Sequence, residues 1–373
     1  MNIDLEKNYK THSPGYVIEI YNNGHEEEIV VGNRETKPFV KECNKDTLYD
    51  IASLTKTYTA TLIYMAYEDG LLDINAYVKS IDERFCHLDK VTILDLLSHN
   101  QDIWTDGYLG SAKSRNNFYH ILFTSYVKSK IPTYVDTHYI ILSTILERIY
   151  NKPFATLLEE KIFKKLDLKN TTINPKGDNI ASNNYETLNG EIIDYIKPGL
   201  IHDTKGRIGK VLGITTGHAS IFTTGHDLLE FLKSFFECTL LKEETIKLML
   251  EHQDRNKQNY NLLKEIVPIN DDVNIMVKEA LKINPNLKLV RTYNNMGTRY
   301  RNNIQALNDI PPNCSENSIT FSGYTGPSYL IDFDRKIIIV VMCNVMHNTK
   351  LDRYQRKHIT DSIIESIYNQ ISK

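Results

Sequence analysis

The chain has 373 residues, of which 41% are hydrophobic and 24% are charged, and its formal net charge is −3. This composition is typical of a globular protein that is long enough to bury a large core and to divide into two lobes. Because the charge is nearly balanced, we expect neither nucleic acid nor an anionic membrane surface as a main partner. No stretch approaches the ~18 apolar residues of a membrane span, so none is predicted.

The N-terminal ten residues contain no apolar export-signal core, which predicts a cytoplasmic protein. Neither the five scattered cysteines nor the twelve histidines show the spacing of a metal site. Glycine-rich nucleotide-binding motifs are also absent from the sequence. We therefore predict reduced thiols, no metal and no cofactor, and the oligomeric state stays open.

Residues 15–22 and 26–31 flank Asn23-Gly24 and predict a β-hairpin. Apolar residues at helical spacing after Ser53 predict a helix that stops at Gly70. A short helix is expected at about 92–100.

The middle of the chain is predicted to be mostly helical, with helices within 132–150, 153–166 and 227–236. Residues 198–224 are rich in glycine and small polar residues, which predicts a loop. Residues 253–300 show no pattern that supports a prediction.

Near the C-terminus, residues 318–321, 328–332 and 336–344 predict three strands. Isoleucines at helical spacing between residues 359 and 371 predict a final helix.

Ser53 and Lys56 form an S-x-x-K pair at the start of the predicted helix after Ile51. Residues three apart share a helix face, so the Lys56 amine can reach the Ser53 hydroxyl. A serine needs such a base to act as a nucleophile, and burial can lower the pKa of a lysine enough to make it one. The alternative is a helix-capping serine beside a solvated lysine.

The S-x-x-K pattern is weak by itself, because Ser125 and Lys128 also match it. Ser53 follows an apolar segment and precedes a helical pattern, whereas Ser125 is soon followed by Pro132. We therefore expect Ser125 to be an ordinary polar residue of the surface.

Further short motifs follow Ser53-Leu-Thr-Lys56 in a fixed order along the chain. They are Leu-Asp-Leu-Leu-Ser-His at 94–99, Tyr134-Val-Asp136, and the segments 151–154, 162–171, 217–224 and 321–326. Together, from about Thr47 to Asn348, they resemble the serine β-lactamase and penicillin-binding-protein superfamily. The branch that is most similar contains class C β-lactamases, D-alanyl-D-alanine peptidases and related esterases.

The resemblance implies an α/β (α+β) fold, with a mainly antiparallel sheet built from both chain ends, flanked by helices, and an inserted helical lobe. We expect residues 1–75 and 285–373 to form the sheet lobe, residues 76–284 the helical lobe, and the active-site cleft to lie between them.

The resemblance also implies the roles of individual residues. Ser53 would be the nucleophile, and Lys56 and Tyr134 would transfer the proton. Backbone N–H groups of Ser53 and Tyr324 would form the oxyanion hole. Ser322 and Gly323, which precede Tyr324 in the strand motif, would line the cleft.

Two positions depart from the pattern of this superfamily. Asp136 stands where asparagine is usual, and it either caps the helix that begins there, faces the site, or does both. A carboxylate that faced Lys56 would hold the lysine charged. Phe321 stands where lysine or histidine is usual, as a core residue or an apolar wall. His218 either lines the cleft or is structural.

We predict a serine hydrolase that forms an acyl-enzyme at Ser53 on a small-molecule or peptide-like ester or amide. Because Phe321 removes a cation that could hold a substrate carboxylate, esterase-like action is favoured over efficient β-lactamase or D,D-carboxypeptidase action. The alternative is a non-catalytic protein that binds a ligand or peptide on the same scaffold.

Overall fold

A computed structural model describes residues 5, 11–130, 132–183, 186–188, 191–194, 197–252, 282–283, 293–300, 310–347, 351 and 353–372. Most of the segment 253–300, for which the sequence supports no prediction, lies outside these residues. Within the described residues, no helix is both long and apolar enough to cross a lipid bilayer.

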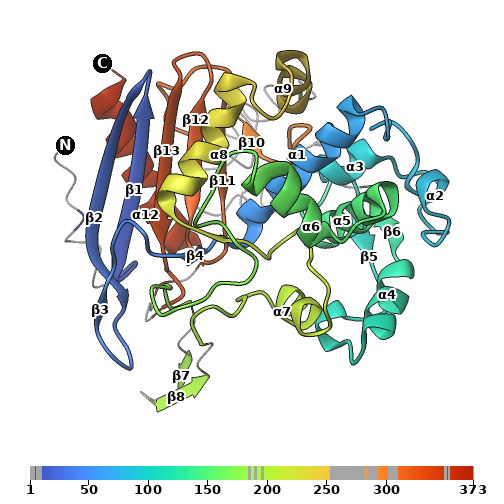
Figure 1. The fold of residues 1–373 in the computed structure, drawn as a ribbon, viewed down its shortest axis with the longest axis horizontal. Helices are drawn as coiled ribbons and strands as arrows, with labels where there is room; N and C mark the ends of the chain where they lie inside the picture. Colours follow the sequence, from blue (N-terminus) through green and yellow to red (C-terminus); the bar gives the residue numbers. More distant parts are fainter. Residues whose placement is uncertain are drawn as a thin grey trace.

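The main sheet has seven strands in the order β10-β11-β12-β13-β1-β2-β3, and neighbouring strands run antiparallel. The strands are β1 (Gly15–Asn22), β2 (His25–Glu35), β3 (Lys41–Glu42), β10 (Arg299–Tyr300), β11 (Ser318–Ser322), β12 (Ser328–Asp332) and β13 (Ile337–Cys343). The pairing of β1 with β13 joins the two ends of the chain (Figure 1), which confirms the predicted fold class. The predicted hairpin is also confirmed, because Asn23 and Gly24 adopt the positive φ angles, 47° and 98°, of its tight turn.

Each face of the sheet is covered by a helix. Alternate residues of β13 point to opposite faces, so Val340 packs on one side with α8 (Gly225–Glu237) and Val341 on the other with α12 (Arg353–Ile371). Figure 1 shows these two helices on either side of the strands. Full burial of such a branched side chain stabilises the fold by roughly 1.5–3 kcal/mol.

The remaining helices lie mainly beside the sheet, on the right in Figure 1. They are η2 (Ala52–Leu54), α1 (Thr55–Glu68), α2 (Val78–Ile81), α3 (Ile93–Leu97), η3 (Leu109–Ser111), α4 (Arg115–Phe123), α5 (Thr137–Tyr150), α6 (Phe154–Leu158), the π-helical turn η4 (Glu159–Phe163), α7 (Thr204–Val211) and α9 (Glu243–Leu250). Three short strand pairs are β4 (Tyr49–Asp50) with β9 (Phe222–Thr223), β5 (Asp102–Trp104) with β6 (Tyr126–Ser129), and β7 (Glu186–Leu188) with β8 (Glu191–Asp194).

Two expectations from the sequence are wrong. The segment 198–224 is not all loop, because it contains α7, whose first turn is capped when the Asp203 carboxylate accepts the Gly206 N–H. Glycine suits this helix, because a Cβ on Gly206 would lie 2.6 Å from the Ala219 carbonyl oxygen. Ser125 is buried rather than on the surface, and its hydroxyl donates to the Leu122 carbonyl.

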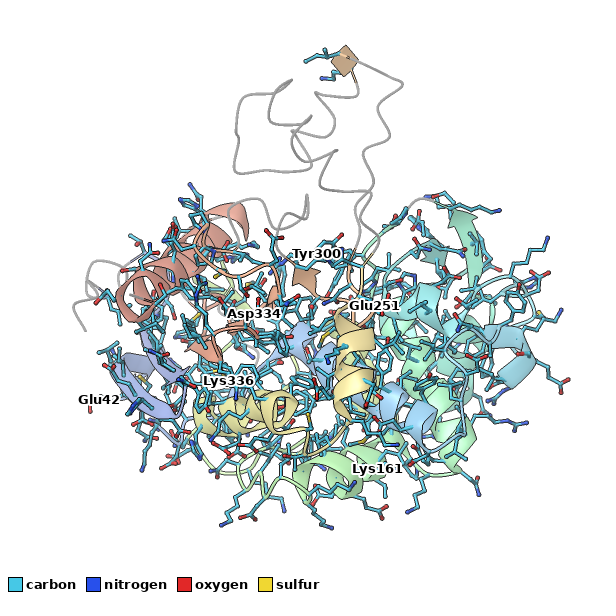
Figure 2. The ribbon with its side chains drawn as sticks, turned by 90° about the horizontal axis from the view of Figure 1, so that it is seen from above. Glu42, Lys161, Glu251, Tyr300, Asp334 and Lys336 are labelled. Atoms are coloured by element: carbon cyan, nitrogen blue, oxygen red, sulfur yellow. The ribbon has the colours of Figure 1, made fainter. Side chains whose placement is uncertain are left out.

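The division into a sheet lobe and an inserted helical lobe stays a prediction. Viewed from above (Figure 2), Asp334 and Lys336 lie on the sheet side, whereas Lys161 of η4 lies on the helical side. Helix α8 falls within the predicted insertion but contacts β1 and β13 of the sheet.

Candidate active site

Ser53 lies in η2, a short 3-10 turn that leads directly into α1, and it is half-buried. The residue before it, Ala52, has a left-handed φ of 44°, a conformation that costs energy for a residue with a Cβ. Its N–H donates to the buried Asp50 carboxylate over 2.8 Å, which holds the strained turn in place. The nucleophile candidate is therefore positioned by a rigid turn rather than by a mobile loop.

Lys56 is 1% exposed, and its ammonium contacts three oxygen atoms. It lies 3.0 Å from Ser53 Oγ, 2.9 Å from Asp136 Oδ1 and 3.4 Å from the His218 carbonyl oxygen. Burial alone would lower the pKa of Lys56, but the negative charge of Asp136 and contacts with Tyr134 outweigh it and raise the pKa. Lys56 is therefore charged in the resting site.

Tyr134 lies in the extended segment just before α5, beside the Lys56 ammonium. Lys56 Nζ is 4.8 Å from the centroid of the Tyr134 ring. The ring centroids of His99 and Phe321 lie 4.4 and 6.4 Å from that of Tyr134, so the phenol is held between a buried imidazole and a strand residue. This geometry brings Tyr134 and Ser53 to the same lysine.

His99 is itself held by a second histidine, His138 of α5, over 2.8 Å between their Nδ1 atoms. Burial lowers the pKa of His138 to about 3 and holds that of His99 well below its ordinary value. Both rings are therefore neutral at neutral pH, and they add no positive charge behind Tyr134.

Asp136 occupies the N-cap position of α5, but its side chain makes no capping hydrogen bond. Its two oxygens instead pair with two ammonium groups, Lys56 on Oδ1 and Lys205 on Oδ2, each over 2.9 Å. Burial would raise the pKa of Asp136, but the attraction of Lys56 and the other nearby cations holds it well below its ordinary value. The Asp136 side chain therefore faces Lys56 rather than capping the helix.

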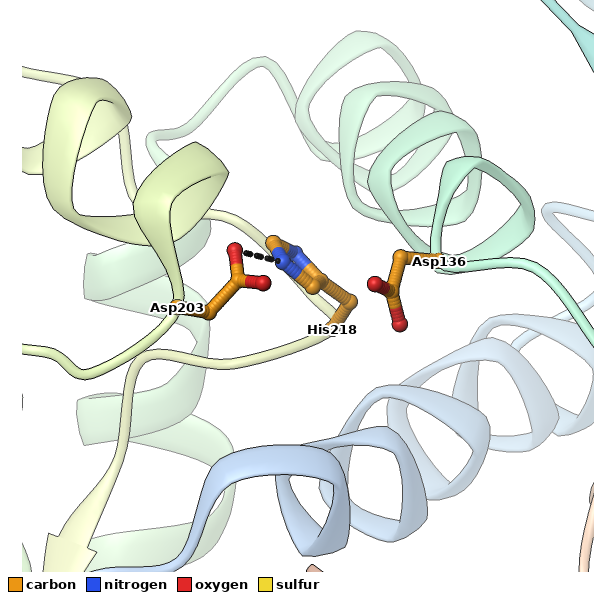
Figure 3. Close-up of side chains that lie close together, drawn as sticks. All are labelled: Asp136, Asp203 and His218. Carbon is orange, nitrogen blue, oxygen red and sulfur yellow. Dashed lines mark hydrogen bonds and ion pairs between the residues drawn. The ribbon is translucent and has the colours of Figure 1, made fainter. Parts of the chain in front are cut away.

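Asp203 and His218 extend the ion pairs beyond Lys205. Asp203 lies 3.1 Å from Lys205 Nζ and 2.8 Å from His218 Nε2. Figure 3 shows the His218 ring between the carboxylates of Asp203 and Asp136. Since His218 is 1% exposed, its ring is structural rather than cleft-lining, while its carbonyl reaches Lys56.

One oxygen of Asp136, one of Asp203 and a His218 ring nitrogen lie within 4.8 Å of one another, the spacing of a metal site. The sequence predicts no metal, because its histidines show no metal-ligand spacing. The ammonium groups of Lys56 and Lys205 already pair with these carboxylates. Since their charges would repel a divalent cation, the donor set fits an ion-pair network better than a metal.

The segment that carries His218 fits between α1 and α5 because Gly217 has no side chain. A Cβ at Gly217 would lie 2.5 Å from the Tyr139 carbonyl oxygen of α5. The Gly217 N–H donates to Ser143 over 3.0 Å, and its carbonyl accepts from Thr59 over 2.7 Å. These bonds fix the His218 carbonyl beside Lys56.

Strand β11 ends next to the turn of Ser53. Phe321 is 3% exposed, and its ring packs near those of Tyr134 and Tyr329, so it is a core residue beside Tyr134. Ser322 accepts a hydrogen bond of 2.8 Å from the guanidinium of Arg299 on β10. A cation is therefore present at the strand motif, although not at position 321.

Gly323 and Thr325 attach the end of β11 to the residues before Ser53. A Cβ at Gly323 would lie 2.6 Å from the Ile51 carbonyl oxygen, so only glycine allows this approach. Thr325 Oγ1 donates to the Asp50 carbonyl over 2.6 Å. Tyr324, between them, is 46% exposed, and its ring lies 5.4 Å from that of His202.

Sequence reasoning missed Lys205, Asp203 and Arg299 as residues of this site. The Asp203-Thr-Lys205 start of α7 is a helix-start signal that could have been recognised. Nothing in the unpatterned segment around Arg299 indicates that β10 brings it to Ser322.

The model of the family described as Beta-lactamase matches residues 3–362, nearly the whole chain. The chain belongs to the β-lactamase family. Among curated proteins it is similar to an N-acetylmuramyl-L-alanine amidase of Bacillus subtilis (strain 168), with 22% identity over 86% of this chain and 76% of the amidase.

Two solved structures show the same fold at low identity. A class C β-lactamase from Rhodobacter sphaeroides superposes with a TM-score of 0.67 and 15% identity, over 97% of each chain. EstCE1, described as a hydrolase with promiscuous acyltransferase activity, gives a TM-score of 0.70 and 15% identity over 96% of each chain. Membership of the β-lactamase family makes this protein a serine hydrolase.

Proposed function

We propose that this β-lactamase-family hydrolase forms an acyl-enzyme at Ser53. The observation that carries the proposal is the 3.0 Å distance between Lys56 Nζ and Ser53 Oγ. Nucleophilic catalysis by a serine requires a base within hydrogen-bond distance of its hydroxyl, and the amine of Lys56 meets that requirement once it has lost its proton.

In the proposed reaction, Ser53 Oγ forms a bond to the substrate carbonyl carbon while its proton passes to the Lys56 and Tyr134 pair. The same pair returns the proton to the leaving alcohol or amine as the bond to the carbonyl carbon breaks. Water then hydrolyses the ester at Ser53, with the proton transfers in the reverse sense. Because Lys56 is charged at rest, activity should rise with pH as the lysine loses its proton.

The backbone N–H groups of Ser53 and Tyr324 are proposed to stabilise the oxyanion. Support comes from the contacts of Gly323 with Ile51 and of Thr325 with Asp50, which hold Tyr324 next to the turn of Ser53. Such donors do not depend on side-chain identity, so the substitutions at positions 136 and 321 leave them intact.

An ester with a neutral acyl group is the favoured substrate class. Because Phe321 stands at position 321, no cation is available there to hold a substrate carboxylate, and the structural similarity to EstCE1 agrees with this choice. A cytoplasmic location stays a prediction.

Arg299 supports a second candidate, an amide or ester that carries a carboxylate. Its guanidinium already donates to Ser322, and a charge-assisted bond to a substrate carboxylate is worth about 1.5–3 kcal/mol. We expect Arg299→Leu to raise KM for carboxylate-bearing substrates by about tenfold or more and to leave neutral esters unchanged. Steady-state kinetics on a matched pair, a carboxylate ester and its amide-capped analogue, measures this. Equal effects on both substrates would remove the second candidate.

Mass spectrometry after incubation with a fluorophosphonate and, separately, with penicillin tests the proposed function. A stable adduct on Ser53 supports the acyl-enzyme. Ester turnover without penicillin labelling supports the neutral-ester preference. Folded protein that reacts with neither reagent and turns over no ester would favour the non-catalytic binding protein.

A further inference from the structure

Asp136 holds one ammonium group on each of its oxygens, an arrangement that the sequence gives no reason to expect. Lys56 comes from α1 and Lys205 from α7, and each lies 2.9 Å from its oxygen. The carboxylate is therefore shared rather than devoted to Lys56.

We propose that Lys205 is a positioning residue whose ammonium offsets part of the charge of Asp136, so that Asp136 attracts the Lys56 ammonium less strongly than an unpaired aspartate would. This inference rests on the proposed function, in which Lys56 must give up its proton to act. It explains how an aspartate occupies this position with a smaller effect on the charge of Lys56 than an unpaired carboxylate would have.

Lys205 is well suited to this task, because it is fixed in place and stays charged. It is bound between Asp136 and Asp203, at 2.9 and 3.1 Å, and its side chain is 19% exposed. Asp203 in turn is fixed by the Gly206 N–H over 2.9 Å and by His218. The two carboxylates outweigh the effect of burial and raise the pKa of Lys205, so it is charged at neutral pH.

The charge that Lys56 experiences comes from groups on several elements. The titratable side chains around it are Asp136, His138 and Tyr139 of α5, Tyr134 before α5, His99 after α3, Lys205 of α7 with its cap Asp203, and His218 of the following loop. The histidines after α3 and in α5 are neutral, and burial raises the pKa of Tyr139 well above its ordinary value. Lys205 and the two carboxylates therefore dominate the local charge.

The test is the pH dependence of kcat/KM for an ester in a cycle of four proteins: wild type, Asp136→Asn, Lys205→Met and the double variant. The acid limb of this profile is the range in which kcat/KM rises as Lys56 loses its proton. Without Lys205, the charge of Asp136 acts on Lys56 alone, so this limb should move up by about one pH unit or more. Asp136→Asn should move it down by a similar amount. In the double variant, which removes one charge of each sign, the limb should lie above that of Asp136→Asn and below that of Lys205→Met.

Two further variants separate this role from a structural one. Lys210→Met on the same helix removes a lysine that bonds to the Ile173 carbonyl instead, and it should leave the limb in place. Lys205→Arg should restore the wild-type limb, because it keeps the charge. If Lys205→Met does not fold, Lys205→Gln removes the same charge and is judged by the same shift.

Titration of the Lys56 side chain by NMR in wild type and in the Lys205 variant gives a readout that does not need turnover. An upward shift of about one unit without Lys205 is expected. If neither the acid limb of kcat/KM nor the NMR titration of Lys56 moves when Lys205 is removed, the role of Lys205 is overturned, even if Ser53 is labelled normally. If removal of Lys205 shifts the NMR titration as expected but the wild type forms no Ser53 adduct, the proposed function alone would be overturned.

Discussion

Ser53→Ala is expected to abolish the fluorophosphonate adduct and to lower ester turnover at least about 10³-fold, as loss of the nucleophilic serine does in other serine hydrolases. The variant should fold normally, because Lys56 keeps its bonds to Asp136 and to the His218 carbonyl. Intact-protein mass spectrometry and steady-state kinetics measure the two effects.

The second S-x-x-K serine provides a matched control for this prediction. Ser125 is buried, and its hydroxyl donates to the Leu122 carbonyl over 2.6 Å, far along the chain from the proposed site. Ser125→Ala should cost about 1 kcal/mol of stability and leave labelling intact. An adduct that persists in Ser53→Ala, or disappears in Ser125→Ala, would assign the nucleophile elsewhere.

Lys56→Met is expected to lower the rate of Ser53 acylation by about 10²–10⁴-fold, the usual contribution of a general acid and base. Its stability cost should be about 1–3 kcal/mol, below the usual cost of breaking a buried ion pair, because Asp136 keeps Lys205 as a partner. Stopped-flow labelling and thermal unfolding measure the two quantities.

Lys56→Met combined with Asp136→Asn serves as the control for stability. The double variant removes both charges of the pair, so it should be more stable than Lys56→Met while acylation stays slow. An acylation rate within about tenfold of wild type in Lys56→Met would show that another group accepts the Ser53 proton.

The raised pKa of Lys56 also sets the sign of a pH effect on stability. Its folded-state pKa lies above the 10.5 of an ordinary lysine, so its charge stabilises the fold fully below that pH and progressively less as pH rises through the folded-state value. Activity should change in the opposite direction, because it requires the unprotonated amine. Thermal unfolding and ester turnover across the same pH range should therefore diverge as pH rises above 10.5.

Most elements of the fold could be predicted because their signals are local. The Asn23-Gly24 turn, the apolar spacing after Ser53 and the β-rich run of β13 each lie within one short segment, and the structure confirms all three. Helix α7 was missed because its glycines suggest a loop, whereas they allow close contact with the Ala219 carbonyl, a tertiary feature.

By itself, the sequence determined that an amine and a hydroxyl lie together, since the three-residue spacing of Ser53 and Lys56 brings them within hydrogen-bond distance wherever the rest of the chain lies. Only the tertiary structure decided the charge of that amine. The anion on it is 80 residues away along the chain, and the second lysine on that anion comes from a helix further still. Electrostatic energy depends on distance in space and on burial, which a linear motif does not record.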